Sequence, residues 1–411
     1  MDLNDPNRET GLTMSNPAST PPLPTHAEVV VVGGGVMGTS IAFHLAEAGV
    51  RDVVVLEQGT LGCGSSAKPL GGVRATFSDP GNVLLGQRSL ETYEGFAERF
   101  STDIGLRQVG YLFLCRTDAE VAAVEASTAM QQSLGASGRM IGLDEAARLN
   151  PLVDTSVLTG ASFSPRDGYA EPAQVVAAYA TALTSLGGRV HEGVTVTGIE
   201  TSSGAVTAVE TDHGTIWTGA VVVAAGAWSA QLGAMAGVPL PVVPVRRQIG
   251  FTPHSVNPDG RRFPTVPFTL DLSTTLYFHN YDGGMLLGIS NADEPEGFDR
   301  VFDDAWVPAF DDAARIVAPS LVGRPLEGGW AGLYENTPDH NAIIGVSRHL
   351  DGFFYATGFS GHGFLQAPAV GEVVRDLYRG VEPFLDVTPF DVARFDPDPA
   401  GHALLAEVHI I

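Results

Sequence analysis

Apolar and glycine positions near the start of the chain predict one β-α-β unit. Residues 28–32 form an apolar run that predicts a buried strand. Residues 36–48 then place Ile41, Leu45 and Ala48 on one face of a helix, which Gly49 is expected to end. Residues 52–56 predict a second buried strand. The whole unit has about the thirty-residue length of one crossover connection.

Helical and strand patterns alternate along the rest of the chain. The predicted helices cover residues 82–100, 118–134, 143–149, 171–186 and 363–378, and strands dominate 110–115, 189–223, 241–290 and 341–360. This order predicts a mixed α/β (α+β) fold, in which a Rossmann-like nucleotide-binding domain is interrupted by a second domain with an antiparallel sheet.

The same pattern predicts a discontinuous domain organisation. The nucleotide-binding domain is expected to comprise residues 27–110, 150–240 and 335–380, and the substrate domain residues 111–149 and 241–334. Residues 1–26 are rich in Pro, Ser, Thr and Asn and predict a disordered tail. Residues 381–411 would form a C-terminal extension.

A glycine motif lies between the first strand and the first helix. Gly33, Gly35 and Gly38 fit G-x-G-x-x-G, which provides a tight turn, close approach to a pyrophosphate and close helix packing. The helix N-terminus offers N–H groups and a positive dipole end to phosphates. Glu57 ends the second strand, 22 residues after Gly35, where an acid accepts hydrogen bonds from ribose hydroxyls. A carboxylate there would repel the 2′-phosphate of NADP.

The motif alone leaves NAD and FAD open. Residues 221–229 (VVVAAGAWS) and 352–364 (GFFYATGFSGHGF) resemble further glycine-bearing strand ends directed at the same ligand. A soluble NAD dehydrogenase usually holds its nucleotide unit in one continuous block, so these distant segments favour FAD.

Charge and cysteine content narrow the functional classes. The chain has 23 Lys and Arg against 47 Asp and Glu, a net charge of −24, which argues against binding nucleic acid or anionic membranes. Cys63 and Cys115 lie far apart, so neither a disulfide framework nor a metal site is predicted. We find no signal-peptide pattern and no apolar run of membrane-spanning length. A cytoplasmic protein without membrane insertion is therefore expected.

Five segments together resemble the D-amino-acid oxidase superfamily. The resemblance runs from about residue 27 to 380 and is greatest to the branch with sarcosine oxidases, dimethylglycine dehydrogenase and the β subunits of dye-linked proline dehydrogenases. It implies an FAD enzyme that oxidises a C–N bond by hydride transfer to flavin N5, giving an imine that hydrolyses. The segments are EVVVVGGGVMGTSIAFHLAEAG…VVVLEQG, GVRATFS, AVVVAAGAWS, GWAGLYENTPDHNAIIG and GFSGHGFLQAPAVGE.

The resemblance also implies which residues contact FAD. The glycine motif and Glu57 would bind the ADP half, Ser65 and Ser66 would follow the pyrophosphate and flavin, and residues 360–363 would lie by the pyrimidine edge. A helix that begins near Phe364 would direct its positive end at the flavin N1–C2=O region, where negative charge develops. The full expected set is Gly33, Gly34, Gly35, Val36, Met37, Gly38, Glu57, Gln58, Ser65, Ser66, Val194, Ala225, Gly226, Trp228, Gly332, Gly361, His362, Gly363, Phe364 and Leu365.

Several positions depart from the family pattern. Some members attach FAD through a cysteine just before the LYE segment, where this chain has Gly332, and others through a histidine whose nearest match is Lys68. We therefore expect non-covalent FAD. Two family lysines, one for the substrate carboxylate and one for reaction with oxygen, are replaced by Leu365 and by residues 285–287. A dehydrogenase is thus as compatible with the pattern as an oxidase.

The resemblance suggests catalytic candidates on the substrate side. Arg74 could hold a carboxylate bidentately, or contact an FAD phosphate or lie at the surface. Tyr334 and Tyr277 could form aromatic walls around the amine, although both could be ordinary core residues. His279 and His362 are polar candidates, as is His340, and a lone histidine is often structural. Hydride transfer needs a neutral amine rather than a dedicated base, and burial against aromatic rings favours that form.

The expected substrate is a secondary or tertiary amine, or an N-alkyl or cyclic amino acid. Either molecular oxygen or an electron-transfer partner would be the acceptor. Two alternatives stay open at this point: oxidation of a 2-hydroxy acid by the same fold, and a flavoprotein subunit that acts only in a complex.

Overall fold

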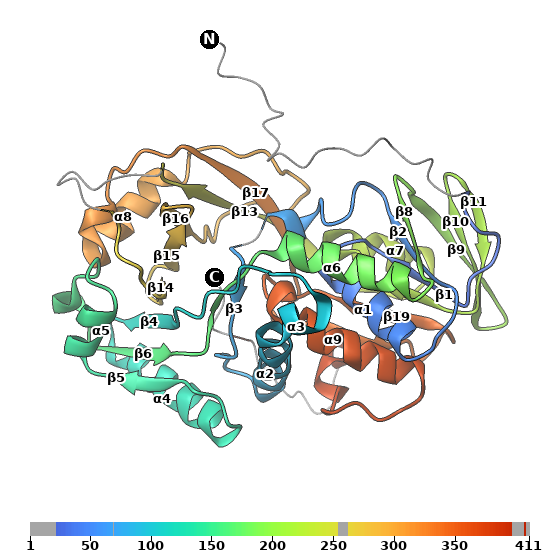
Figure 1. Cartoon of the computed structure of the whole chain (residues 1–411), viewed down its shortest axis with the longest axis horizontal. Coiled ribbons are helices and arrows are strands. Elements are labelled where there is room, and N and C mark those ends of the chain that lie inside the picture. Colours follow the sequence, from blue (N-terminus) through green and yellow to red (C-terminus); the bar gives the residue numbers. More distant parts are fainter. Residues whose placement is uncertain (1–21, 69, 254–261, 397–406, 408–411) are drawn as a thin grey trace, which may run out of the picture.

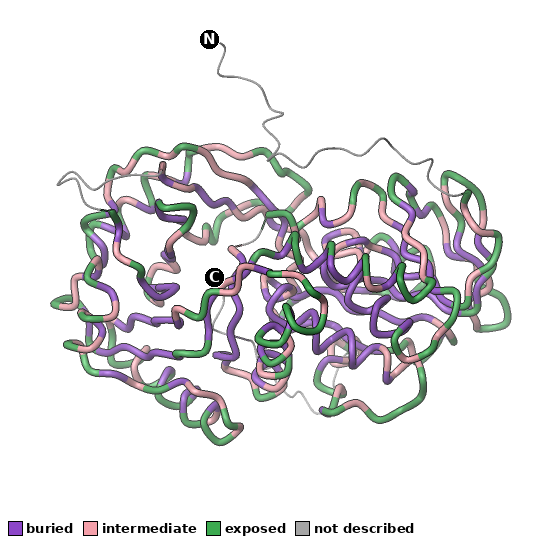
Figure 2. Tube along the Cα trace, in the orientation of Figure 1, coloured by how far each residue is buried: buried purple, intermediate pink, exposed green. Residues whose placement is uncertain are grey.

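The computed structural model describes residues 22–68, 70–253, 262–396 and 407. Two sheets organise these residues, and Figure 1 shows them side by side, with the chain passing between them several times. Figure 2 shows the buried segments gathered around both sheets, while exposed segments lie in the peripheral turns and helix faces. The mixed α/β class predicted from the sequence is confirmed.

The first sheet has six strands, all parallel to their neighbours except the edge strand β18, which runs antiparallel to β19. In β1 the side chains of Val29 and Val31 face the helices, and those of Val30 and Val32 face the opposite layer. Both faces are therefore apolar, as parallel sheets require. The strands in order are β18 (Ile343–Val346), β19 (Phe353–Thr357), β12 (Val221–Val223), β1 (Val29–Val32), β2 (Val53–Glu57) and β8 (Arg189–Glu192).

Helices cover one face of this sheet and a small sheet covers the other. The helical layer is α1 (Val36–Glu47), α6 (Pro172–Ser185) and α9 (Gly363–Tyr378), whose buried side chains share one core (Figure 1). The opposite layer is an antiparallel meander with a short helix. Its elements are β9 (Val196–Ser202), β10 (Ala205–Thr211), β11 (Gly214–Trp217) and α7 (Ser229–Met235).

The second sheet has eight strands, antiparallel throughout except for the parallel pair β14 and β4. One of its faces packs against α8 (Val307–Val317) and α5 (Leu143–Leu149) in a continuous apolar core. The strands in order are β17 (Gly328–Asn336), β13 (Val243–Phe251), β16 (Gly284–Ile289), β15 (Leu276–Tyr281), β14 (Phe268–Asp271), β4 (Tyr111–Cys115), β6 (Gly160–Ser164) and β5 (Arg139–Ile141). Helix α4 (Asp118–Ser133) follows β4.

Two parts of the predicted organisation differ from the structure. Residues 160–164 were assigned to the nucleotide-binding domain, but as β6 they pair with β4 and β5 in the eight-stranded sheet. The predicted helix over 82–100 is two helices, α2 (Pro80–Glu94) and α3 (Phe96–Phe100), because the chain turns at Gly95. The Asp79 carboxylate caps α2 by accepting hydrogen bonds from the backbone N–H groups of Gly81 and Asn82. A two-stranded ribbon, β3 (Gly72–Val73) with β7 (Gly168–Tyr169), links the two regions.

Part of the predicted N-terminal tail, residues 22–26, lies among the described residues. Residues 1–21 lie outside the described residues, whereas residues 22–26 are ordered, contrary to the prediction. His26 forms a β-bridge with Trp217, and Leu23 packs against the core beneath the meander. Of the expected C-terminal extension, residues 381–396 pack on the first sheet region with Phe390 buried, and residue 407 is also described.

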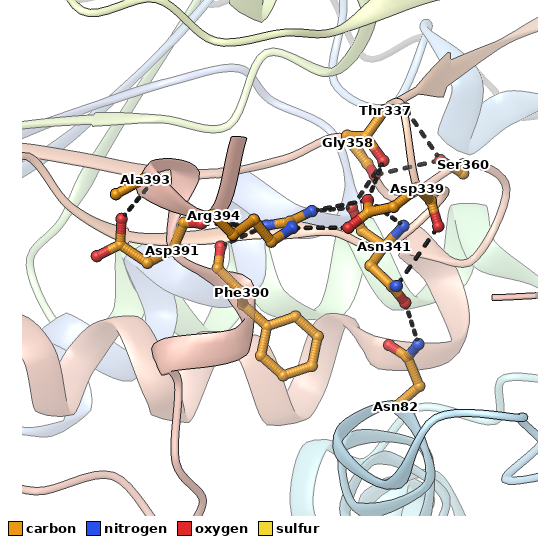
Figure 3. Close-up of polar contacts among 10 residues, drawn as sticks. All are labelled: Asn82, Thr337, Asp339, Asn341, Gly358, Ser360, Phe390, Asp391, Ala393 and Arg394. Carbon is orange, nitrogen blue, oxygen red and sulfur yellow. Dashed lines mark hydrogen bonds and ion pairs between the residues drawn. The ribbon is translucent and has the colours of Figure 1, made fainter. Parts of the chain in front are cut away.

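A buried ion pair fastens the C-terminal segment to the loop after β17 (Figure 3). Arg394 donates from Nε to Asp339 Oδ2 at 2.8 Å and from its terminal nitrogen to Oδ1 at 3.0 Å. The Asp339 carboxylate also accepts from Thr337 Oγ1 and from the backbone N–H of Asn341, both at 3.1 Å. The Asp339 and Arg394 side chains are only 3% and 10% exposed. This bidentate geometry fixes the loop that leads to the cavity described below.

Removing the cation should destabilise the fold strongly. Arg394→Ala leaves the Asp339 carboxylate buried without its partner, and we expect the free energy of unfolding to fall by about 3 kcal/mol. Urea unfolding of the purified protein measures this. The control is Arg315→Ala, since Arg315 and Asp312 form an exposed pair, 60% and 78% exposed, for which less than about 1 kcal/mol is expected. Equal effects of the two substitutions would contradict the assignment.

Candidate active site

One cavity runs from the carboxyl edge of the six-stranded sheet to the inner face of the eight-stranded sheet. At one end it is lined by the β1–α1 joint, the end of β2 and the loop after it. At the other end it is lined by β13, β15, β17 and the start of α9. Ligands of open parallel sheets bind at this edge, so the position of the cavity agrees with the nucleotide motif.

Glycine is sterically required at two positions of the glycine joint, the segment from Gly33 to Gly38 at the junction of β1 and α1. Gly33 has φ +115°, and a Cβ there would collide with the carbonyl oxygen of Ala224. A Cβ on Gly38 would collide with the carbonyl oxygen of Gly33, so the first turn of α1 can lie against the end of β1 only with glycine there. The joint therefore opens α1 directly at the cavity, with its positive dipole end towards it.

The end of β2 and the following loop are held by hydrogen bonds to that joint. Glu57 accepts from the backbone N–H groups of Gly34 at 2.7 Å and Gly59 at 2.8 Å. A carboxylate offers about four acceptor sites, so capacity for ribose hydroxyls is left on the cavity side. The hydroxyl of Ser66 accepts from the backbone N–H of Val36 at 2.9 Å.

The start of α9 forms the opposite wall. Gly361 has φ +96° and Ser360 has φ +50°, and a Cβ on Gly361 would meet the ring of Tyr334. His362 occupies the N-cap position of α9 and lines the cavity. A non-glycine residue at positive φ is costly, so the turn is kept in this shape by its surroundings, among them Glu335, which accepts from Thr357 Oγ1 at 3.0 Å and from Phe359 N–H at 3.3 Å.

The cavity collects most of the residues expected to contact the cofactor. All of the expected set line it except Gly34 and Gly38, which lie just behind its surface. Gly34 contributes its N–H to Glu57, and Gly38 provides the close packing of α1.

Comparison with known proteins identifies the family. Residues 28–377 match the family described as FAD dependent oxidoreductase. The chain belongs to this family. Its cofactor class is therefore FAD, as the distant glycine segments predicted.

Relatives within this family of FAD-dependent oxidoreductases include enzymes of amines and amino acids. The chain is 29% identical to 4-methylaminobutanoate oxidase (formaldehyde-forming) of Paenarthrobacter nicotinovorans, over 96% of this chain but only 48% of that protein. It is 31% identical to glycine oxidase of Geobacillus kaustophilus, over 89% of this chain and 97% of the other. The solved L-proline dehydrogenase from P. horikoshii superposes with a TM-score of 0.84 at 32% identity, covering 91% of this chain and 98% of that one. The chain thus spans about half the length of some relatives and nearly all of others.

Arg74 lines the cavity and is fully buried rather than at the surface. It donates from one terminal nitrogen to the carbonyl oxygen of Thr76, and its other terminal nitrogen lies 3.3 Å from His362 Nε2. A guanidinium can only donate, so His362 accepts at Nε2 and carries its proton on Nδ1. The Arg74 guanidinium also lies 4.3 Å from the ring centre of Phe77. Burial lowers the pKa of Arg74 from its usual value.

A buried carboxyl supports the Arg74 segment from behind. Asp167 accepts from the backbone N–H of Ala75 at 3.2 Å and from Thr76 Oγ1 at 3.1 Å. Burial raises the pKa of Asp167 to about 6 in spite of these hydrogen bonds and the nearby Arg74.

Tyr334 and Tyr277 line the cavity as expected for the aromatic walls. The Tyr277 ring lies over Gly288, where a side chain would collide with it. Burial raises the pKa of both phenols, so both stay neutral near neutral pH.

The structure places His279 and His340 differently from the other candidates. Within the described residues, neither lines the cavity. His279 is stacked on Phe268 with ring centres 4.7 Å apart, its two nitrogens lie within 3.1 Å of backbone carbonyl oxygens, and burial lowers its pKa to about 4. We conclude that His279 packs against Phe268 and Tyr169, away from the cavity surface.

Sequence analysis overlooked several lining residues. Tyr111, Arg247 and Glu335 face the cavity from β4, β13 and β17. Burial raises the pKa of Glu335 to about 7. A signal for Arg247 existed: it is a charged residue between the apolar, same-face positions Val245 and Ile249 of a predicted strand.

Two further searches of the described residues had negative results. No helix there combines the length and apolar character needed to cross a membrane. Nor do three His, Cys, Asp or Glu side chains come together there as a candidate metal site.

The packing of α1 on β1 can be tested at Gly38. Ala normally stabilises a helix interior relative to Gly, but at this position the methyl group would push α1 away from Gly33. We expect Gly38→Ala to weaken FAD binding roughly 10-fold, which is within the range of about 1–3 kcal/mol that overpacking costs. Fluorescence titration of the FAD-free protein with FAD measures the affinity. Gly219→Ala is the control, because a Cβ there meets no atom within 4 Å; equal losses would refute the assignment.

Asp167 should make stability depend on pH. In the folded protein the Asp167 carboxyl keeps its proton up to about pH 6. In the unfolded chain the same carboxyl loses its proton near pH 4. The free energy of unfolding should therefore fall by about 3 kcal/mol as pH rises from 4 to 6, and this contribution should be flat above that. Unfolding of Asp167→Asn at several pH values should lack this slope, and the exposed control Asp304→Asn should retain it. A slope that persists in Asp167→Asn would assign it to other groups.

Proposed function

We propose that this protein oxidises the C–N bond of a secondary or tertiary amine, or of an N-alkyl or cyclic amino acid, with FAD as the hydride acceptor. The observation that carries the proposal is the single cavity that joins the glycine joint at Gly33 to the aromatic face at Tyr277 and Tyr334. A dinucleotide and a small substrate can meet there without leaving the cavity. FAD, when bound, supplies the hydride-accepting N5 of its flavin, and the imine product would then hydrolyse.

The relatives' names support this substrate class. A methylaminobutanoate oxidase, a glycine oxidase and an L-proline dehydrogenase all act on amines or amino acids. The glycine oxidase and the proline dehydrogenase match this chain over nearly their whole length, so the similarity includes the substrate side of the cavity.

We also propose that FAD is held without a covalent bond. Gly332 and Lys68, at the two positions where relatives would carry the linking residue, offer neither thiol nor imidazole. The cavity at the carboxyl edge of the six-stranded sheet instead offers non-covalent contacts. These are the N-termini of α1 and α9 and the side chains of Glu57 and Ser65.

The chain's own residues have defined tasks in this proposal. The aromatic walls exclude water and favour the neutral amine, because burial penalises an ammonium ion. Arg74 holds His362 in one tautomer at the start of α9, and the helix dipole stabilises negative charge at the adjacent end of the cavity. Positioning rather than proton transfer would supply much of the rate.

The acceptor that reoxidises the flavin, either molecular oxygen or an electron-transfer partner, and the cytoplasmic location remain predictions from the sequence. The anaerobic titration described next also tests whether oxygen is the acceptor.

Anaerobic titration tests the proposal. Purified protein should show a visible flavin absorption band that is bleached by one or more of a panel of N-methyl amino acids, cyclic amino acids and simple secondary amines. Admitting air then shows whether oxygen restores the band. Bleaching only by 2-hydroxy acids would replace C–N by C–O oxidation, and a protein that binds no FAD would refute the proposal. Release of FAD into the supernatant after acid precipitation tests the non-covalent attachment.

A further inference from the structure

Arg247 extends from the eight-stranded sheet into the cavity lining and has no role in the function proposed above. Arg247 lies on β13 on the same face as Ile249, and its register partner on β17 is Gly332. Because that partner has no side chain, nothing on β17 covers Arg247 from directly opposite.

The Arg247 guanidinium has a hydrogen-bond donor without an acceptor in the protein. Its guanidinium lies 5.5 Å from the ring centre of Tyr334, and one terminal nitrogen donates to the carbonyl oxygen of Arg246 at 3.1 Å. Its Nε is buried and has no hydrogen-bond partner, and within the described residues Arg247 forms no ion pair. A buried N–H without an acceptor costs free energy, so a ligand acceptor at this point would be stabilising.

The neighbouring Arg246 is paired with carboxylates, in contrast to Arg247. Arg246, on the opposite face of β13, pairs with Glu294, Asp299 and Asp303 at 2.5–3.1 Å. Arg300, which also lines the cavity, lies 5.5 Å from the ring centre of Trp228, beside the β12 end of the first sheet rather than on the eight-stranded sheet. Arg74, by contrast, already donates to Thr76 and His362.

We propose that Arg247 binds the carboxylate of the substrate, so that the enzyme selects amino acids over amines without a carboxylate. This inference rests on the function proposed above. A guanidinium holds a carboxylate with two parallel hydrogen bonds, and the Tyr334 ring packs against the guanidinium and restricts its position. The carboxylate is thereby anchored on the eight-stranded sheet. It is not anchored at Arg74, which lies on the segment that leads into α2.

Binding of matched neutral and charged probes tests the proposal in the FAD-loaded protein. Acetate and 2-furoate, each paired with its amide, are titrated while the flavin absorption spectrum is followed. The unmodified protein should bind at least one acid roughly 30-fold or more tightly than its amide. Arg247→Gln should abolish this preference, and Arg247→Lys, which keeps the charge but not the planar fork, should retain part of it. The control Arg315→Gln changes the net charge equally at an exposed site on α8 and should leave the preference unchanged.

Flavin reduction separates this inference from the proposed function. With proline and pyrrolidine as a pair, Arg247→Gln should raise the KM for proline at least about 30-fold while kcat falls much less, and should raise the KM for pyrrolidine far less than that for proline. Equal binding of acid and amide by the unmodified protein, or an acid preference that survives in Arg247→Gln, would overturn the role of Arg247 while amine oxidation stands. Failure of every amine to reduce the flavin would instead refute the proposed function. If Arg247→Gln does not fold, the acid–amide comparison in the unmodified protein and Arg247→Lys still decide the outcome.

Discussion

The close approach of α1 to β1 is the contact on which the site depends. Gly38 lies against the carbonyl oxygen of Gly33 with no room for a methyl group. This contact puts the backbone N–H of Val36 where Ser66 can accept from it, which fixes the loop after β2. The same loop reaches the second sheet, because Ser65 Oγ donates to the carbonyl oxygen of Leu333 at 2.6 Å. The Gly38–Gly33 contact and two serine hydrogen bonds thus connect the β1–α1 end of the cavity to the eight-stranded sheet.

Charge is distributed unevenly between the surface and the cavity. The chain carries a net charge of −24, yet the substrate end of the cavity presents Arg74 and Arg247 beside neutral phenols. Each arginine is held by an aromatic ring, Phe77 for Arg74 and Tyr334 for Arg247. Such contacts orient a guanidinium without neutralising it. The two guanidinium groups therefore place positive charge inside the cavity of a chain whose net charge is negative.

Local signals made part of this structure predictable. The β-α-β unit was predicted to within one or two residues, and α9 over its full length, because valine runs, glycine and helical periodicity lie close together in sequence. The pairing of β6 with β4 and β5 was not predictable in this way, since it depends on partners distant along the chain. The exclusion of His279 from the cavity surface is likewise tertiary: only the arrangement of β14 and β15 puts its ring against Phe268. The alternation around Arg247 marked it as a charged residue on an apolar strand face, but its position beside Gly332 depends on a strand pairing that the sequence does not show.

The strand order of the six-stranded sheet also bears on how the protein is made. β1 lies between β2 and β12, and β12 lies next to β19, so adjacent strands come from residues 29–32, 221–223 and 353–357. The ribosome therefore releases β1 long before β12 exists, and one edge of the valine strand stays unpaired until more than half of the chain has been made. Nascent chains in such a state expose aggregation-prone edges and fold slowly. The yield of native protein in cells should accordingly depend on chaperones that bind the chain during translation.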